Sequence, residues 1–309
     1  MNTILLKDLL EAGCHFGHKV ERWHPKAAVF IYGAKEGVHI IDLAKTKLAL
    51  EAALAYVEDL GITGKNFLFV GTKRQAKGIV SEAANSAGIY FLTNRWIGGF
   101  LTNHDEVKKN IEKLNRMKKE SSDGSWNQFP KHERVKLEKE MRKLVRVYGG
   151  VADLSGVPSA IYIVDIKKES SAVKEAKRKN IPIIAVVDTN TDPTSVDYAI
   201  PANDDAVGSI KYITDRIASA YGEGRKMGEK DRIEKKETSF PKETPFEGGK
   251  EETNKEEIGA YKTKPSDVIN AIEEEKVEKV EKKPKVDRVE KVEKVEKKPK
   301  KRGRPKKKI

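Results

Sequence analysis

Residues Asn66–Gly78, NFLFVGTKRQAKG, begin with a short apolar run that leads through a glycine turn into a helix-forming segment. Apolar runs of similar length recur at Ala160–Val164 and Ile183–Val187. Continuous apolar strands that alternate with amphipathic helices are typical of a parallel sheet covered on both faces. The sequence therefore predicts an α/β fold, a Rossmann-like (flavodoxin-like) mostly parallel sheet with helices on both faces.

The other segments of the first 222 residues extend this alternation. Thr3 is placed to cap a first helix, and Asp42 to cap a long helix that Gly61 would end. Asn203–Asp205 is a further group of capping side chains, before the last helix. The remaining predicted strands are Val29–Tyr32, Val38–Ile41, Ile89–Leu92 and Tyr198–Ile200, and the remaining predicted helices are Arg74–Ala87, Lys168–Lys179 and Asp205–Tyr221.

One segment, at about residues 103–148, interrupts the alternation with two polar, basic helices that flank the turn sequence SSDGSWNQFP. Apolar residues recur at intervals of four and three in both helices, which indicates a narrow coiled-coil seam. We expect an inserted, protruding antiparallel helical hairpin. Its outer faces are rich in Lys and Arg, which suits either a partner surface or an ordinary solvated face. The seam residues are Val107, Ile111, Leu114, Leu137, Met141, Leu144 and Tyr148.

The net charge of +13 divides almost equally between two very different regions. Residues 223–309 hold 28 basic and 21 acidic residues, a net +7, and the first 222 hold 33 and 27, a net +6. The later region has three aromatic residues and repeats VEKVEKKPK, so it cannot bury enough apolar area to offset its ordering entropy. We expect an α/β domain over 1–222 and a disordered charged repeat tail over 223–309.

The tail ends in a basic cluster, KKPKKRGRPKKKI, with no acidic residue from Lys297 onward. Such a run binds phosphate through counterion release. Its Arg302–Pro305 core also resembles an AT-hook, which binds the minor groove of A·T-rich DNA, so a solvated basic tail and a DNA-binding segment are both open.

Several classes of function are disfavoured by the composition. The apolar runs are strand-length, far short of the roughly 20 residues of a membrane helix, so we expect no membrane association. The single cysteine, Cys14, suits a reducing compartment. Cys14, His15, His18 and His24 lie close together in sequence, but their spacing matches no established metal motif, and packed or RNA-contacting histidines are the alternative.

A nucleotide enzyme is the main rival interpretation of an α/β sheet. The turn after Val70 has neither G-x-G-x-x-G nor G-x-x-x-x-G-K-[ST], so its backbone cannot cradle a pyrophosphate. The aspartates of Asp188–Asp192 could bind magnesium, but Asx–Thr–Pro clusters more often form turns. We therefore expect no enzyme activity, no cofactor and no small-molecule substrate. Thr72, Lys73 and Arg74 at this turn could instead meet a polymer phosphate.

Seven blocks resemble the bacterial-type ribosomal small-subunit protein two family, in family order. They are LLEAGCHFGH at Leu9–His18, WHPKAAVFIYGAKEGVHIIDLAKT at Trp23–Thr46, FVGTKRQA at Phe69–Ala76, TNRWIGGFLTN at Thr93–Asn103, PSAIYIVDIKKESSAVKEA at Pro158–Ala176, IPIIAVVDTNTDP at Ile181–Pro193 and IPANDDA at Ile200–Ala206. The basic repeat tail lies outside the resemblance, because family members often stop soon after the last core helix.

The resemblance implies a cytoplasmic, non-catalytic role on the ribosome. It implies binding of small-subunit ribosomal RNA between head and body, next to neighbouring small-subunit ribosomal proteins, and support for attachment of ribosomal protein one. Aromatic and cationic residues in loops can stack on unpaired bases and meet phosphates. For Trp96 an ordinary core role is the alternative. The candidate RNA-binding residues are Trp23, Pro25, Lys26, Lys73, Arg74, Arg95, Trp96, Lys108, Lys109 and Arg116.

Overall fold

The computed structural model describes residues 3–238, and its centre is a five-stranded parallel sheet in the order β5-β4-β6-β7-β8. This is the flavodoxin-like order, in which the chain reverses its direction of growth between β4 and β6. The predicted fold class is confirmed. The strands are β4 (Phe67–Val70), β5 (Tyr90–Leu92), β6 (Ala160–Ile163), β7 (Ile183–Val187) and β8 (Tyr198–Pro201).

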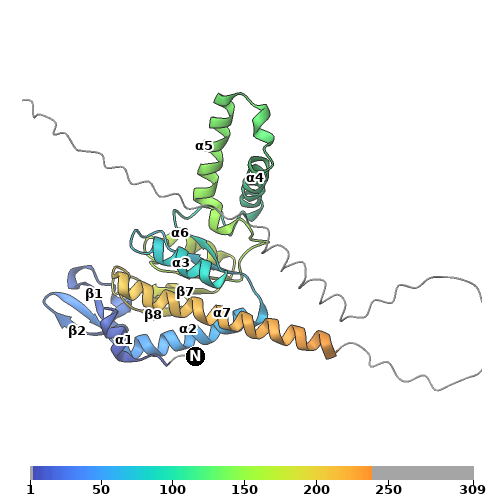
Figure 1. Cartoon of the computed structure of the whole chain (residues 1–309). Helices are drawn as coiled ribbons and strands as arrows, with labels where there is room; N and C mark the ends of the chain where they lie inside the picture. The colour runs from blue at the N-terminus through green and yellow to red at the C-terminus, as the bar shows by residue number, and fades with distance from the viewer. Residues whose placement is uncertain (1–2, 239–309) are drawn as a thin grey trace, which may run out of the picture. The chain divides into compact units, whose positions relative to one another are not determined.

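The two faces of this sheet bury two separate apolar clusters, because successive side chains of a strand point to opposite sides. Phe67 and Phe69 join the cluster formed with α1, α2, α3 and α7, whereas Leu68 and Val70 join the one formed with α6 and the base of the hairpin. Figure 1 shows α2 and α7 side by side on the same side of the sheet. The helices named here are α1 (Leu6–Glu11), α2 (Leu43–Thr63), α3 (Lys77–Ala87), α6 (Ser170–Arg178) and α7 (Val207–Thr238).

Helix α2 begins where the sequence predicted but ends later. The Asp42 side chain accepts a hydrogen bond from the Ala44 backbone N–H at 3.0 Å, so the predicted cap is confirmed. The predicted end at Gly61 is wrong: the helix ends before Gly64, which adopts the left-handed conformation with φ +67°. Gly61 instead permits a close crossing, since a Cβ there would lie 2.5 Å from the Tyr221 carbonyl oxygen of α7.

Other predicted helix boundaries also differ. Helix α6 spans Ser170–Arg178 rather than Lys168–Lys179, and α7 begins at Val207 rather than Asp205. Helix α1 begins at Leu6, so Thr3 is not its cap, and α3 begins at Lys77 rather than Arg74. The last helix continues from Tyr221 to Thr238, because glycines beyond that point pack closely against α2. The predicted disordered tail is covered only over 223–238, where the chain continues α7; its repeats, basic cluster and AT-hook-like segment lie outside the described residues.

A second, three-stranded antiparallel sheet in the order β1-β3-β2 precedes α2. It consists of β1 (Phe16–Lys19), β2 (Ile31–Lys35) and β3 (Val38–Ile41). The sequence predicted β3, misplaced β2 and missed β1. Residues Pro25–Phe30 form a short 3-10 helix, η2, instead of the start of a strand. Glu36 and Gly37, both with positive φ, form the tight turn between β2 and β3.

The inserted hairpin consists of α4 (His104–Ser122) and α5 (Lys131–Tyr148), joined through η3 (Ser125–Gln128). The two helices lie antiparallel and side by side and protrude from the sheet (Figure 1). On α4 the predicted seam residues are buried, and on α5 only Tyr148 is fully buried while the others are half-buried. Short 3-10 segments η1 (Val20–Arg22), η4 (Gly149–Val151) and η5 (Pro193–Ser195) complete the elements.

Candidate functional site

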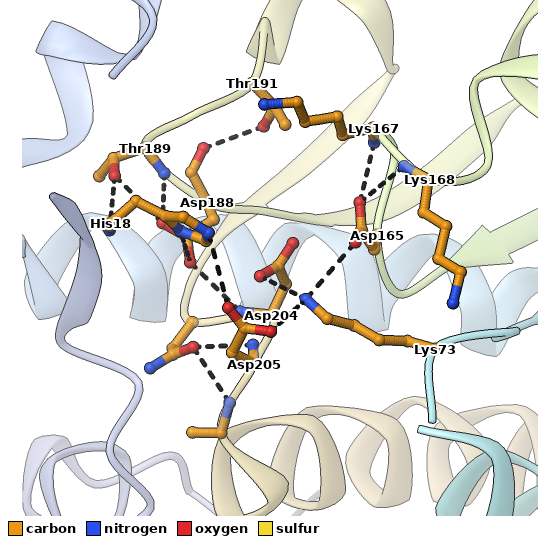
Figure 2. A network of polar contacts seen from close by, with 12 residues as sticks. His18, Lys73, Asp165, Lys167, Lys168, Asp188, Thr189, Thr191, Asp204 and Asp205 are labelled. Carbon is orange, nitrogen blue, oxygen red and sulfur yellow. Dashed lines mark hydrogen bonds and ion pairs between the residues drawn. The ribbon is translucent and has the colours of Figure 1, made fainter. Parts of the chain in front are cut away.

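A cluster of charged side chains lies beyond the carboxyl ends of the parallel strands (Figure 2). Lys73 follows β4, Asp165 follows β6, Asp188 follows β7, and Asp204 follows β8. His18 reaches the cluster from β1 of the small sheet. The position between β4 and β6 is where open α/β sheets bind ligands, because the diverging connections leave a crevice there.

The Lys73 ammonium is the centre of this cluster. Its Nζ lies 2.7 Å from Asp205 Oδ1, 2.9 Å from Asp204 Oδ1 and 3.4 Å from Asp165 Oδ2, and its side chain is 14% exposed. Burial lowers the pKa of Lys73, but the hydrogen bonds to Asp205 and Asp204 raise it by more than burial lowers it. The net pKa is therefore well above its usual range. The lysine therefore pairs with aspartates of the crevice. It does not present a free cation to a phosphate, although the sequence had suggested that role.

His18 links the two sheets through the same cluster. Its Nδ1 lies 3.0 Å from Asp188 Oδ2 and its Nε2 lies 3.5 Å from Asp205 Oδ2. The hydrogen bond to Asp188 raises the pKa of His18, opposed by partial burial. Burial, with the charges of Asp165 and Asp188 nearby, raises the pKa of Asp204 to about 7.

The same residues could also hold a metal ion. Ligand atoms of His18, Asp188 and Asp204 lie within 4.8 Å of one another, and one imidazole with two carboxylates is a donor set that suits zinc. The sequence cluster of Cys14, His15, His18 and His24 is not assembled: Cys14 is fully buried in the apolar core, and the His24 ring caps η2. Of those four residues, only His18 belongs to the group.

The turn after β4 is covered by the chain itself. A Cβ at Gly71 would lie 2.7 Å from Val80, and the Thr72 hydroxyl donates to the buried Glu169 carboxylate. Lys168 Nζ donates to the Thr72 carbonyl at 3.1 Å. Arg74 is exposed just before α3. The crevice used for nucleotides in other α/β sheets is thus filled here by internal hydrogen bonds and ion pairs, which agrees with the missing glycine motif.

A loop that carries two predicted RNA-binding residues, Arg95 and Trp96, is held by one carboxylate of α6. Glu175 accepts hydrogen bonds from Trp96 Nε1 at 3.0 Å and from the backbone N–H groups of Gly99 at 2.9 Å and Leu101 at 3.1 Å, and two weaker ones from Thr102. Burial raises the pKa of Glu175, but these donors outweigh it and the net pKa is lowered. Trp96 is 9% exposed and packs on Phe100, which favours its core interpretation, whereas Arg95 is exposed.

The predicted loop at Trp23, Pro25 and Lys26 is open to solvent. The Trp23 side chain is 41% exposed, beside His39, and Pro25 begins η2. Lys26 Nζ pairs with Asp192 Oδ2 at 2.7 Å and also donates to Thr194. The loop therefore combines the accessible indole of Trp23 with the ammonium of Lys26, which is paired with the partly exposed Asp192.

The predicted hairpin residues Lys108, Lys109 and Arg116 are all exposed. The side chains of these three cations are at least 65% exposed, and each contacts a glutamate on its own helix. The pairs are Lys108 with Glu112, Lys109 with Glu106, and Arg116 with Glu120. Exposed pairs of this kind are worth little, so a phosphate could replace the glutamate at small cost. No ion pair is found in the described part of the chain for the further hairpin cations Lys118, Lys119, Lys136, Lys139, Lys143 and Arg146.

The polar cluster was not predicted as a unit, although the sequence carried a signal for it. Lys73, Asp165, Asp188 and Asp204 each follow a predicted strand of the parallel sheet by one to four residues. Carboxyl ends of parallel strands share one edge, so these side chains had to come near one another. The contribution of His18 had no such signal, because β1 was not predicted.

Comparison with known proteins matches residues 9–224 to the family model described as ribosomal protein S2. The small ribosomal subunit protein uS2 of Desulfatibacillum aliphaticivorans is 48% identical over 74% of this chain and 77% of its own length. That of Bdellovibrio bacteriovorus is 42% identical over 84% of both chains, and that of Dictyoglomus turgidum 45% identical over 75% of this chain and 94% of its own.

In the described residues, no helix combines the length and apolarity needed to cross a bilayer. The chain belongs to the ribosomal protein S2 family, whose members are structural components of the small ribosomal subunit and not enzymes.

Proposed function

We propose that this protein binds small-subunit ribosomal RNA between the head and body of the subunit, chiefly through its hairpin. The observation that carries the proposal is the charge of α4 and α5: residues 104–148 hold 13 basic and 8 acidic residues, a net +5, around a buried apolar seam. Because the apolar seam residues of α4 and α5 pack against each other, the cations lie on the outer faces of the hairpin. There they can contact successive phosphates of an RNA backbone.

The exposed loops supply a second class of contact. Trp23, with Pro25 and Lys26, offers an aromatic ring and a cation for an unpaired base and its phosphate. Arg74 and Arg95 are exposed cations at the edges of the domain. Trp96 and Lys73, buried or ion-paired, act as supports that hold these segments in place.

The same proposal includes protein neighbours on the subunit, among them ribosomal protein one. It is supported by apolar side chains left exposed on the small sheet and η2. Tyr32 is 81% exposed, Val29 65% and Phe16 49%. Exposed apolar side chains of this kind suit a protein partner.

Charge reversal on the hairpin tests the RNA proposal. The triple variant Lys108→Glu, Lys109→Glu, Arg116→Glu should join small subunits poorly when a lysate is sedimented, because reversing three exposed charges lowers the net charge by six units. A matched control exchanges partners, Lys109→Glu with Glu106→Lys, which keeps the net charge. Normal subunit occupancy of a folded triple variant would refute the assignment.

A separate variant tests attachment of ribosomal protein one. Val29→Asp with Tyr32→Ser should leave rRNA binding intact and lower the amount of ribosomal protein one that sediments with subunits. Retention of that protein at the normal level would contradict the docking surface.

A further inference from the structure

The outer surface of α6 has an unusual charge distribution. Residues 167–179 contain six basic and two acidic residues, a net +4 in 13 residues. Both acids point inward: Glu169 accepts from Thr72, and Glu175 holds the loop of residues 96–102. Lys168 is engaged with the Thr72 carbonyl. In the described structure no ion pair is found for the other five cations, all exposed: Lys167, Lys174, Lys177, Arg178 and Lys179.

This surface differs from that of the hairpin. Several of the hairpin cations, such as Lys109 and Lys113, have glutamate partners on the same helix or the facing one, whereas none of these five α6 cations has an ion pair in the described structure. Like charges at neighbouring positions of a helix destabilise it. The helix dipole favours Lys177 and Arg178 in the last turn, but the excess of positive charge on this face still suits an anionic ligand.

A pocket of about 370 Å³ lies at the foot of this cationic face. Its volume falls in the range of small-ligand sites. Ile166 and Val173 contribute apolar surface, and the Asn190 amide oxygen is buried without a hydrogen-bond partner in the described structure. A rotation of the Asn190 side chain would expose this acceptor to the pocket, where it suits a ligand that brings an N–H group. The lining residues are His24, Ile166, Lys167, Ser170, Val173, Lys174, Lys177, Asn190, Thr191, Asp192 and Ser195.

The only carboxylate in that lining is already neutralised. Asp192 receives hydrogen bonds from Lys26 Nζ at 2.7 Å and from Thr194, and these hold its pKa below the usual range. An anionic ligand at the rim would therefore meet three lysines and no free acid. The Lys26 contact also places the loop containing Trp23 beside the pocket.

We propose that α6 and this pocket bind one unpaired RNA nucleotide, with the base inside and the flanking phosphates on Lys167, Lys174 and Lys177. The inference rests on the proposed RNA-binding function and names a specific site for it. Unpaired bases are recognised by insertion beside apolar or aromatic side chains and by hydrogen bonds to their polar edges. Asn190 would accept an N–H of the base, and the lysines would release counterions on binding phosphate.

The first test measures how rRNA affinity depends on salt, with purified protein and small-subunit rRNA. Lys174→Gln with Lys177→Gln should reduce the slope of log affinity against log salt by about 2, one for each lost phosphate contact. The matched control, Lys226→Gln with Lys230→Gln, removes the same charge from exposed positions on α7 and should leave the slope unchanged. Asn190→Ala should lower affinity roughly 2- to 10-fold with no change in slope.

The second test locates the RNA directly. A hydroxyl-radical source attached to Ser195→Cys, at the pocket rim, should cleave rRNA at a few unpaired positions, whereas the same source at Lys226→Cys should not cleave those positions. The native Cys14 is fully buried and should remain unlabelled. Cleavage from position 195 that is lost in the Lys174→Gln, Lys177→Gln background would support the site.

Three outcomes would overturn the proposal. If the protein binds rRNA but the α6 double variant keeps its salt slope and position 195 yields no cleavage, the site is wrong and the general RNA-binding function survives. If the unsubstituted protein does not bind rRNA, both fail. If free UMP or AMP binds the pocket while Asn190→Ala leaves rRNA affinity unchanged, the pocket serves a small molecule.

Discussion

Replacing Glu175 should destabilise the domain by an amount that follows from its hydrogen bonds. In Glu175→Ala the buried Trp96 Nε1 and Leu101 N–H lose their acceptor, and each buried unsatisfied donor costs about 1–3 kcal/mol. Donors at Gly99 and Thr102 lie nearer the surface and can turn to water. We expect a loss of about 4 kcal/mol in the free energy of unfolding.

The assay is urea unfolding followed by circular dichroism and tryptophan fluorescence. For a domain of this size a loss of about 4 kcal/mol lowers Tm by roughly 8–16 °C. The control Glu51→Ala removes an exposed side chain with a single Lys47 contact and should change stability by less than about 0.5 kcal/mol. Glu175→Gln should fall between the two, because its amide keeps one acceptor oxygen.

The dependence on pH gives an independent readout of the same carboxylate. Its folded-state pKa is lowered, so its contribution is present above the unfolded pKa and is lost as pH falls through the folded pKa. Glu175→Gln should lack that acid-side loss. If Glu175→Ala unfolds within about 1 kcal/mol of the unsubstituted protein at equal m-value, the idea that this carboxylate holds the loop is wrong.

Three further predictions concern the ion cluster and the helix crossing. Lys73→Gln should cost about 3–5 kcal/mol in unfolding free energy, since it leaves buried carboxylates without their cation, while Arg74→Gln, at an exposed site, should be nearly neutral; equal effects would contradict the cluster. The His18 pKa is raised on folding, so its stabilisation is present below the unfolded pKa of about 6.5 and is lost as pH rises through the folded pKa. In the presence of a chelator, His18→Gln should make the decline in Tm above about pH 6.5 less steep, and an unchanged profile would refute this. Gly224→Ala should destabilise by about 1–3 kcal/mol because its Cβ would lie 2.2 Å from the Glu58 carbonyl oxygen, whereas Gly222→Ala, 3.9 Å from its nearest neighbour, should be neutral or gain up to about 1 kcal/mol; tolerance of both in thermal unfolding would argue against the close crossing.

Local patterns were enough to determine most of the sheet and its class. Runs such as Phe67–Val70 and Ile183–Val187 are buried on both faces, so their apolar character is continuous and visible in the sequence. The hairpin seam was also visible, because helical spacing of apolar residues is a local property. Predicted helix ends were less accurate where tertiary packing decides them. Gly61 was predicted to end α2, but it lies within that helix and allows the close approach of α7.

The candidate site divides in the same way. Exposure of Lys26, Arg74 and the hairpin cations could be expected from local charge, since charged side chains remain at the surface unless paired. Trp96 and Lys73 could not be assigned, because an indole or an ammonium has the same local sequence signal whether it is buried with a partner or open to solvent. Glu175 and three aspartates, distant in sequence, determine their placement.

The sequence by itself therefore determined the fold class, the family and the excess of positive charge, because hydrophobic periodicity, motif order and net charge are properties of the linear chain. Only the tertiary structure decided which cations are available. Lys73 is neutralised by residues up to 132 positions away, whereas the cations of α6 are left free because Glu169 and Glu175, the nearest acids in sequence, are turned into the core. Electrostatic pairing depends on distance in space, and that distance is set by the packing of strands and helices.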